Sequence, residues 1–178
     1  MRGHGRERFD KQVRVAINNI PQEFIILKLS DSPRGVKKTA MTLIILVRHG
    51  ETAWNKDKIF RGSIDIPLNE TGRKEARLAG EWLKREKIDA AYSSPLLRAV
   101  ETAQAIASHH GLTVQKLEGL SDLHYGDWQG LPLADVKKKY PDLYRQWETM
   151  PQTVRFPNGE TLEEVRLRAL AAVDDAIA

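Results

Sequence analysis

The chain has 178 residues, of which 41% are hydrophobic and 29% are charged, and its formal net charge is +4. This length and composition predict a soluble, globular chain with room for one domain. It contains no cysteine, which excludes disulfides, thiolate catalysis and cysteine-ligated zinc. No apolar run reaches the roughly 18 residues of a membrane span, so we expect a cytoplasmic protein that does not cross a membrane.

The positive charge is concentrated in residues 1–40, which hold nine Lys or Arg against four Asp or Glu, whereas the remainder sums to −1. We interpret this segment as a basic N-terminal extension, disordered or folded as a hairpin of residues 13–17 and 24–29; alternatively, translation begins at Met41. Only Phe9 and Phe24 accompany the charges, so we do not expect nucleic-acid binding. Its longest apolar run, residues 24–27, is too short for a secretory signal.

The most informative stretch is LVRHGETAWN, residues 46–55. Residues 42–47 form an apolar run that predicts a buried strand, and the polar residues Arg48, His49, Gly50 and Glu51 follow it directly. Side chains at the carboxyl end of a buried parallel strand lie where open α/β sheets bind ligands. An arginine there can make bidentate hydrogen bonds to a phosphate, and a neutral imidazole can attack phosphorus.

The segments after this strand alternate between helix and strand, which predicts an α/β fold with a mostly parallel sheet. The first helix is predicted with Thr71 as N-cap and one apolar face, consisting of Ala76, Ala79, Trp82 and Leu83. Strands are predicted at residues 89–93 and 114–120. The final helix begins with a capping-box pattern at Thr161 and Glu164, and its apolar stripe comprises Leu162, Val165, Leu170, Val173 and Ile177.

The helix between those two strands carries a candidate phosphate ligand. Ser94 is predicted as its N-cap and Pro95 as a first-turn residue, which places Arg98 one turn into the helix, close to the carboxyl edge of the sheet. The SHHG string at residues 108–111 lies at the far end of this helix, and we interpret it as a C-terminal cap with Gly111 left-handed. A further helix, residues 133–147, is predicted to break at Pro141.

Five blocks of the sequence resemble the histidine phosphatase superfamily, the phosphoglycerate mutase-like enzymes. They are LVRHGETAWN (46–55), FRGSIDIPLNETG (60–72), YSSPLLRAVETA (92–103), LSDLHYGDWQGL (120–131) and PNGETLEEVRLRA (157–169). The resemblance implies a three-layer α/β/α fold with a mostly parallel central sheet. It also implies a domain over residues 41–178 and the release or transfer of phosphate from a small phosphorylated substrate.

The resemblance assigns roles to individual residues. His49 corresponds to the nucleophile and Asp122 to the general acid, where relatives usually carry glutamate; Asp127 is a competing acid. The implied phosphate and substrate ligands are Arg48, Thr52, Asn55, Arg61, Gly62 and Arg98. His124 and Tyr125 are interpreted as packing residues, and Trp128 as either a pocket residue or a loop anchor. No metal or other cofactor is expected.

The family pattern continues beyond the last helix into a strand that carries a second histidine, and no such block follows Ala178. We therefore expect either a fragment of a longer product or another segment, such as the N-terminal residues, in that position. A phosphatase is the favoured function. A cofactor-dependent phosphoglycerate mutase and a non-catalytic module that binds phosphorylated ligands are the alternatives, and the sequence does not indicate an oligomeric state.

Overall fold

The computed structural model describes residues 13–15, 24–29 and 44–177. The chain divides into two compact units, residues 1–48 and 49–178, each of which is described by itself below. The predicted boundary between residues 40 and 41 stays a prediction.

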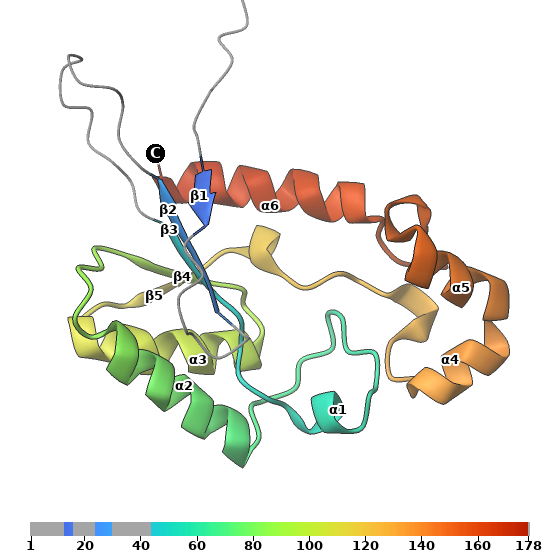
Figure 1. Ribbon diagram of the computed structural model, residues 1–178, viewed down its shortest axis with the longest axis horizontal. Coiled ribbons are helices and arrows are strands. Elements are labelled where there is room, and N and C mark those ends of the chain that lie inside the picture. The colour runs from blue at the N-terminus through green and yellow to red at the C-terminus, as the bar shows by residue number, and fades with distance from the viewer. Residues whose placement is uncertain (1–12, 16–23, 30–43, 178) are drawn as a thin grey trace, which may run out of the picture. The chain divides into compact units, whose positions relative to one another are not determined.

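In the described residues of the first unit, three strands pair in the order β1-β2-β3 (Figure 1). β1 (Val13–Val15) pairs antiparallel with β2 (Phe24–Leu29), so the predicted hairpin strands are both present; its turn lies outside the described residues. β2 in turn pairs antiparallel with β3 (Ile44–Val47), with Phe24 opposite Val47. An N-terminal strand therefore lies beside the strand that leads to His49, which is the pairing considered as an alternative above.

The second unit is helix-rich. Its helices are α1 (Ala53–Lys56), α2 (Glu70–Leu83), α3 (Leu97–Ala107), α4 (Leu133–Lys139), α5 (Pro141–Thr149) and α6 (Leu162–Ile177). β4 (Ala91–Ser93) and β5 (Val114–Lys116) form a parallel pair, with Ala91 opposite Val114. A parallel pair joined through a helix is the unit expected of an α/β fold, so the predicted fold class is confirmed.

Helices α2 and α3 lie side by side (Figure 1) because small residues allow close approach. A Cβ at Gly80 of α2 would lie 2.5 Å from the carbonyl oxygen of Ala105 in α3. The buried face of α2 consists of Gly72, Ala76, Ala79, Gly80 and Leu83. The prediction that Trp82 belongs to this face is wrong: Trp82 is 52% exposed, since a face built on glycine and alanine is narrow and leaves the bulkier ring at its flank.

Two helix starts differ from their predicted positions. α2 is capped by Asn69, whose side chain accepts from Gly72 N at 2.8 Å, and Thr71 is already inside the helix. α3 begins at Leu97 and lacks a cap from its own N-terminal residue. Instead, Leu97 N donates to Asp65 Oδ1 at 2.7 Å, so an acceptor distant in sequence replaces the predicted Ser94.

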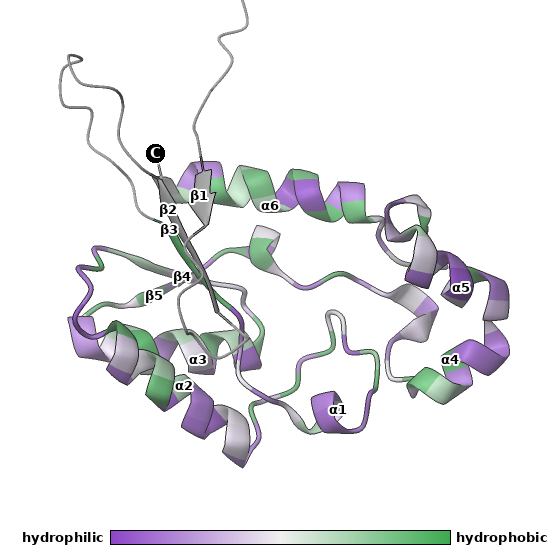
Figure 2. Cartoon of the chain, viewed as in Figure 1, coloured by the Kyte–Doolittle hydropathy of each residue, from purple (hydrophilic) through white to green (hydrophobic). Residues whose placement is uncertain are grey.

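Other local predictions are confirmed. Gly111 is left-handed at φ +65° after the short 3₁₀ turn Ser108–His110, and Pro141 occupies the first turn of α5. Thr161 and Glu164 form the predicted capping box, with Thr161 N donating to Glu164 Oε2 at 2.7 Å and Glu164 N to Thr161 Oγ1 at 3.2 Å. Hydrophobic and hydrophilic residues alternate along α6 (Figure 2), but Leu170 is 50% exposed and lies outside the buried stripe.

The predicted second and third strands are shorter than expected. β5 ends at Lys116 and gives way to a 3₁₀ turn at Glu118–Leu120, followed by loop and a second turn at Gly126–Trp128. Beneath this loop lies a core cluster made of Leu123, Trp128, Val136, Val154 and Phe156. Trp128 has no exposed surface and stacks with Tyr144 at a centroid distance of 6.1 Å. Of the two interpretations of Trp128, the structure supports the loop anchor.

Candidate active site

The histidine loop is tied to the first turns of α3. His49 Nδ1 lies 2.7 Å from the carbonyl oxygen of Gly50. Because a carbonyl only accepts, this contact places the proton of the neutral ring on Nδ1 and the lone pair on Nε2. Gly50 N donates to Thr102 Oγ1 at 3.1 Å, and that hydroxyl donates to the carbonyl oxygen of Arg98 at 2.8 Å. One buried threonine therefore links the nucleophile candidate to the helix that carries the arginine.

Arg98 is the most deeply buried charge of the candidate site, with 1% of the residue exposed. Its guanidinium donates to the carbonyl oxygens of Ile64 at 3.0 Å and Gly62 at 2.7 Å. Its charge is balanced by Asp122, whose Oδ2 lies 3.3 Å from Nη2. A buried charge requires such compensation, and these contacts hold the guanidinium in one orientation. Glu101, on the same helix, pairs with Arg73.

The structure separates the two candidate acids. The Asp122 carboxylate also accepts from Leu123 N at 2.8 Å through Oδ1, and its side chain is 38% exposed, so a ligand could reach it. Asp127 is exposed and accepts from Asn158 Nδ2 at 2.9 Å. Asp122 therefore shares a site with Arg98, whereas Asp127 belongs to a surface contact.

Thr52 and Asn55 bond to each other at the start of α1. Thr52 N donates to Asn55 Oδ1 at 2.9 Å, and Asn55 N donates to Thr52 Oγ1 at 3.4 Å, which is a capping box. Thr52 has no exposed surface, so it supports the loop from inside. Asn55 is half-buried, and its amide nitrogen is the group with donors for an anion.

The loop before α2 presents Arg61 and Gly62. Gly62 has φ +56°, a conformation in which side chains are strained. A Cβ at this position would also lie 2.7 Å from the carbonyl oxygen of Leu123 and against the Gln129 amide. Gln129 Oε1 in turn accepts from Ser63 N at 2.8 Å. The glycine thus brings the Arg61 loop against the Asp122 loop.

Electrostatics identify Tyr125 as a neighbour of the candidate site. Burial and the nearby Asp122 carboxylate raise the pKa of the Tyr125 hydroxyl to about 12, while the positive charge of Arg61 opposes the shift. The ring packs edge-on against Phe60 and Phe156. Tyr125 is therefore a packing residue, as predicted. It is also an uncharged neighbour of the site candidates Asp122 and Arg61, and its position in the sequence did not indicate this second property.

Arg48 is exposed and directly precedes His49 in the chain. Among the described residues, no group of three or more His, Cys, Asp and Glu side chains could hold a metal ion. Within the same part of the chain, no helix is both long and apolar enough to span a membrane.

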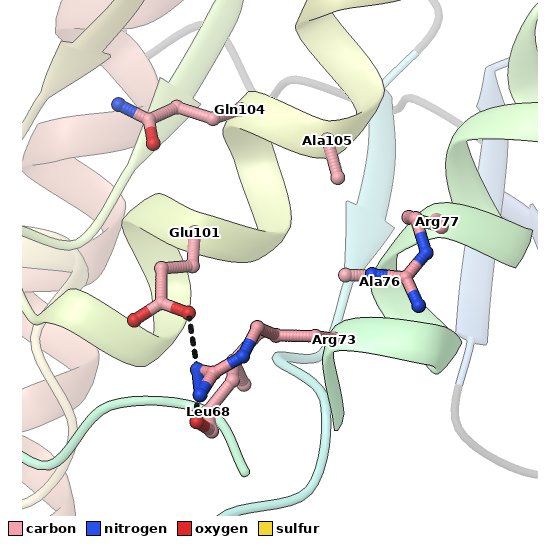
Figure 3. A pocket seen from close by; sticks show the side chains of 7 residues that line it. All are labelled: Leu68, Arg73, Ala76, Arg77, Glu101, Gln104 and Ala105. Atoms are coloured by element: carbon pink, nitrogen blue, oxygen red, sulfur yellow. Dashed lines mark hydrogen bonds and ion pairs between the residues drawn. The ribbon is translucent and has the colours of Figure 1, made fainter. Parts of the chain in front are cut away.

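A pocket of about 200 Å³ lies between α2 and α3 (Figure 3). It is lined by Leu68, Arg73, Ala76, Arg77, Glu101, Gln104 and Ala105. Arg73 spans it by donating to the Glu101 carboxylate and to the carbonyl oxygen of Leu68. None of the predicted site residues lines this pocket, so it is not the candidate active site.

The sequence profile of the histidine phosphatase superfamily (branch 1) matches residues 44–178. The chain belongs to the histidine phosphatase superfamily. Phosphoserine phosphatase 1 of Hydrogenobacter thermophilus is 38% identical over 135 residues, which cover 76% of this chain and 64% of the relative. A phosphoglycerate mutase of Schizosaccharomyces pombe is 41% identical over 138 residues, covering 75% and 65%. The chain thus spans somewhat less than two thirds of these superfamily members.

Solved structures agree with this membership. YhfR of Bacillus stearothermophilus has a TM-score of 0.70 at 32% identity, covering 73% of this chain and 64% of that one. A mycobacterial glucosyl-3-phosphoglycerate phosphatase, solved with VO3, has a TM-score of 0.69 at 32% identity, covering 72% and 64%. The predicted recognition of the superfamily is confirmed, and phosphatase or mutase activity is the activity that the names of these relatives support.

Proposed function

We propose that this protein is a phosphomonoester hydrolase that acts through a phosphohistidine on a small phosphorylated metabolite. The observation that carries the proposal is the connected network of His49, Arg98 and Asp122. The histidine loop hydrogen-bonds to α3 through Thr102, and the buried arginine of α3 pairs with the acid. These contacts support the proposal that His49 is the nucleophile, Arg98 the fixed cation and Asp122 the proton donor of one site.

In the proposed first step, the Nε2 lone pair of His49 attacks phosphorus in line, and the bond from phosphorus to the ester oxygen breaks. Arg98, with Arg48 and Asn55, balances charge on the phosphoryl oxygens. The anionic phosphate competes with Asp122 for the guanidinium of Arg98, which frees the carboxyl group for the leaving oxygen. Asp122 then gives its proton to the leaving oxygen, so that an alcohol departs.

In the second step, water attacks the phosphohistidine. Asp122, now a carboxylate, accepts a proton from the water as the phosphorus–nitrogen bond breaks, and inorganic phosphate leaves. His49 recovers its lone pair, with Nδ1 held at the Gly50 carbonyl throughout. The reaction needs positioning and charge compensation from the chain's own residues.

Arg61 gives a reason to expect an acidic substrate. Three of the relatives are named for phosphoserine, phosphoglycerate and glucosyl-3-phosphoglycerate, each of which carries a carboxyl function besides its phosphate. Arg61 lies close enough to Tyr125 to affect the pKa of the Tyr125 hydroxyl, which the Asp122 carboxylate also affects. We propose that it binds this second acidic group, with Gly62 and the loop that Thr52 supports forming the surrounding wall.

A phosphoglycerate mutase is the second candidate, because a mutase is 41% identical to this chain. It would transfer the phosphoryl group from the histidine to a second hydroxyl instead of to water. Bisphosphoglycerate should then stimulate exchange of phosphate between positions, whereas a phosphatase releases inorganic phosphate without it.

The test is phosphate release from 4-nitrophenyl phosphate and phosphoserine by the 178-residue chain, with His49→Ala as the decisive variant. His109→Ala is the matched control, since His109 lies in the turn after α3 and contacts Glu81 at 3.6 Å. We expect turnover in the wild type and the control and none in His49→Ala. A quench in alkaline denaturant after mixing with labelled substrate should trap a phosphoenzyme that is stable in alkali and loses its phosphate in acid. A folded chain with no turnover would refute the proposal in favour of a binding module.

A further inference from the structure

The loop that carries Asp122 has little regular structure of its own. β5 ends at Lys116, and between the short turns Glu118–Leu120 and Gly126–Trp128 the backbone is neither helix nor strand. Yet the position of the acid depends on this backbone, because aspartate is one methylene shorter than glutamate and has less reach of its own. Something outside the loop must therefore hold residues 119–124.

Arg168 of α6 makes those contacts. Its Nη1 donates to the carbonyl oxygens of Gly119 at 2.9 Å and Ser121 at 2.7 Å, and its Nη2 donates to that of Asp122 at 3.0 Å. Three carbonyl oxygens of the loop thus accept hydrogen bonds from one planar guanidinium. Such a fork fixes direction as well as distance, which an ammonium group cannot do equally well.

Glu160 completes the arrangement from the other side. Its carboxylate accepts from Arg168 Nε at 2.8 Å and Nη2 at 2.9 Å, and also from His124 N at 3.0 Å. Glu160 N donates in return to the carbonyl oxygen of His124 at 2.9 Å. The loop is therefore held on both sides of Asp122, by Arg168 before it and by Glu160 after it.

The pair is charged at neutral pH. Hydrogen bonds from Arg168, and from the His124 backbone, lower the pKa of Glu160 below its ordinary value, although partial burial opposes the shift. Glu160 is therefore the counterion of Arg168, and the guanidinium donates its hydrogen bonds to Glu160 and to the loop carbonyls. It is not placed as a second phosphate ligand.

We propose that Arg168, together with Glu160, is a positioning residue that sets the reach of Asp122 towards the leaving-group oxygen. This inference rests on the proposed function and deepens it. It predicts a selective defect: esters whose leaving group needs a proton should suffer, and esters with a good leaving group should not. A residue that only stabilises the fold would affect both alike.

The chain contains a matched control on the same helix. Arg166 makes a similar two-bond contact with Glu163, through Nε at 2.7 Å and Nη2 at 2.6 Å. Both side chains are exposed, and among the described residues this contact does not involve the loop at residues 119–124. Arg166→Met removes an equivalent ion pair without touching residues 119–124. Arg168→Met and Arg168→Lys are the test variants, the lysine keeping a charge but losing the fork.

The assay compares kcat/KM for phosphoserine, an alkyl ester, with kcat/KM for 4-nitrophenyl phosphate, because this ratio reports the steps up to release of the alcohol and leaves out the hydrolysis of the phosphohistidine that both esters share. We expect Arg168→Met to lower kcat/KM on phosphoserine about 10- to 100-fold, the scale of a misplaced proton donor, with less than about threefold change on the aryl ester. Arg168→Lys should fall in between, and Arg166→Met should match the wild type. Equal losses on both esters, or none on phosphoserine, would overturn the proposal.

A double variant separates positioning from general damage. If Arg168 acts through Asp122, Arg168→Met should add little to the defect of Asp122→Asn on phosphoserine, whereas independent effects would multiply. Amide hydrogen exchange at Leu123 and His124 should also rise in Arg168→Met and not in Arg166→Met. A wild type that hydrolyses neither ester refutes the proposed function, and unchanged exchange at these amides separately refutes the role of Arg168 in holding the loop.

Discussion

Gly62→Ala is the perturbation for which the structure gives the clearest magnitude. The residue has φ +56°, where a side chain costs about 1–2 kcal/mol. The added Cβ would meet the Leu123 carbonyl oxygen at 2.7 Å, and forcing backbone apart in a packed region costs roughly another 1–3 kcal/mol. The free energy of unfolding should therefore fall by about 2–5 kcal/mol.

Gly111→Ala is the matched control. Gly111 has φ +65°, but a Cβ there has nothing within 4 Å, so only the conformational cost of about 1–2 kcal/mol applies. With a urea slope of about 2 kcal/mol per molar, the midpoint of Gly62→Ala should lie roughly 0.5–1.5 M below that of Gly111→Ala. Urea unfolding followed by tryptophan fluorescence measures both midpoints.

Gly62→Ala should also reduce activity in the fraction that folds. The Gly62 carbonyl oxygen accepts from Arg98 at 2.7 Å, so displacing this backbone turns the guanidinium away from its set direction. Equal midpoints for the two variants would refute the reasoning, because the contact with the Leu123 loop would then carry no energy.

Two further predictions concern packing and pH. Leu83→Ala should lower the free energy of unfolding by about 2–5 kcal/mol, because Leu83 is 2% exposed, and Trp82→Ala should lower it less, because Trp82 is 52% exposed. Thermal melts of both variants measure the difference. A larger loss of stability for Trp82→Ala would contradict the assignment of the buried face of α2. The pKa of Tyr125, about 12 in the folded chain, exceeds the roughly 10 of an unfolded tyrosine. The contribution of the Tyr125 hydroxyl to the free energy of unfolding is therefore fully present below pH 10. About 2 kcal/mol of stability is lost as the pH rises towards 12. Tyr125→Phe should make unfolding less pH-dependent in that window, and Asp122→Asn should lower the pKa of Tyr125 in an ultraviolet titration; an unchanged pKa would show that the carboxylate does not act on the hydroxyl.

Sequence alone determined the features that depend on neighbouring residues. The capping box of Thr161 and Glu164, the left-handed Gly111 and the helix start at Pro141 each follow from the conformational limits of one or two side chains. The α/β alternation follows from hydrophobic periodicity. The superfamily was recognisable because its motifs are contiguous blocks. These features need no knowledge of what packs against them.

Other features were decided only by the tertiary structure, because their partners are distant in sequence. Asp65 caps α3 from another loop, and Ser94, the local candidate, does not. Trp82 fits a helical stripe by spacing, yet α3 packs on the glycines and alanines beside it.

The candidate site shows the same division. His49, Arg98 and Asp122 could be nominated from motifs, but their connection through Thr102 and the role of Arg168 could not. An arginine on a helix, eight residues after a glutamate that precedes the helix, resembles any surface charge. It becomes a support for the acid only when folding brings the carbonyls of Gly119, Ser121 and Asp122 to its guanidinium. The sequence therefore determined which chemical groups are present, and long-range packing determined which of them act together.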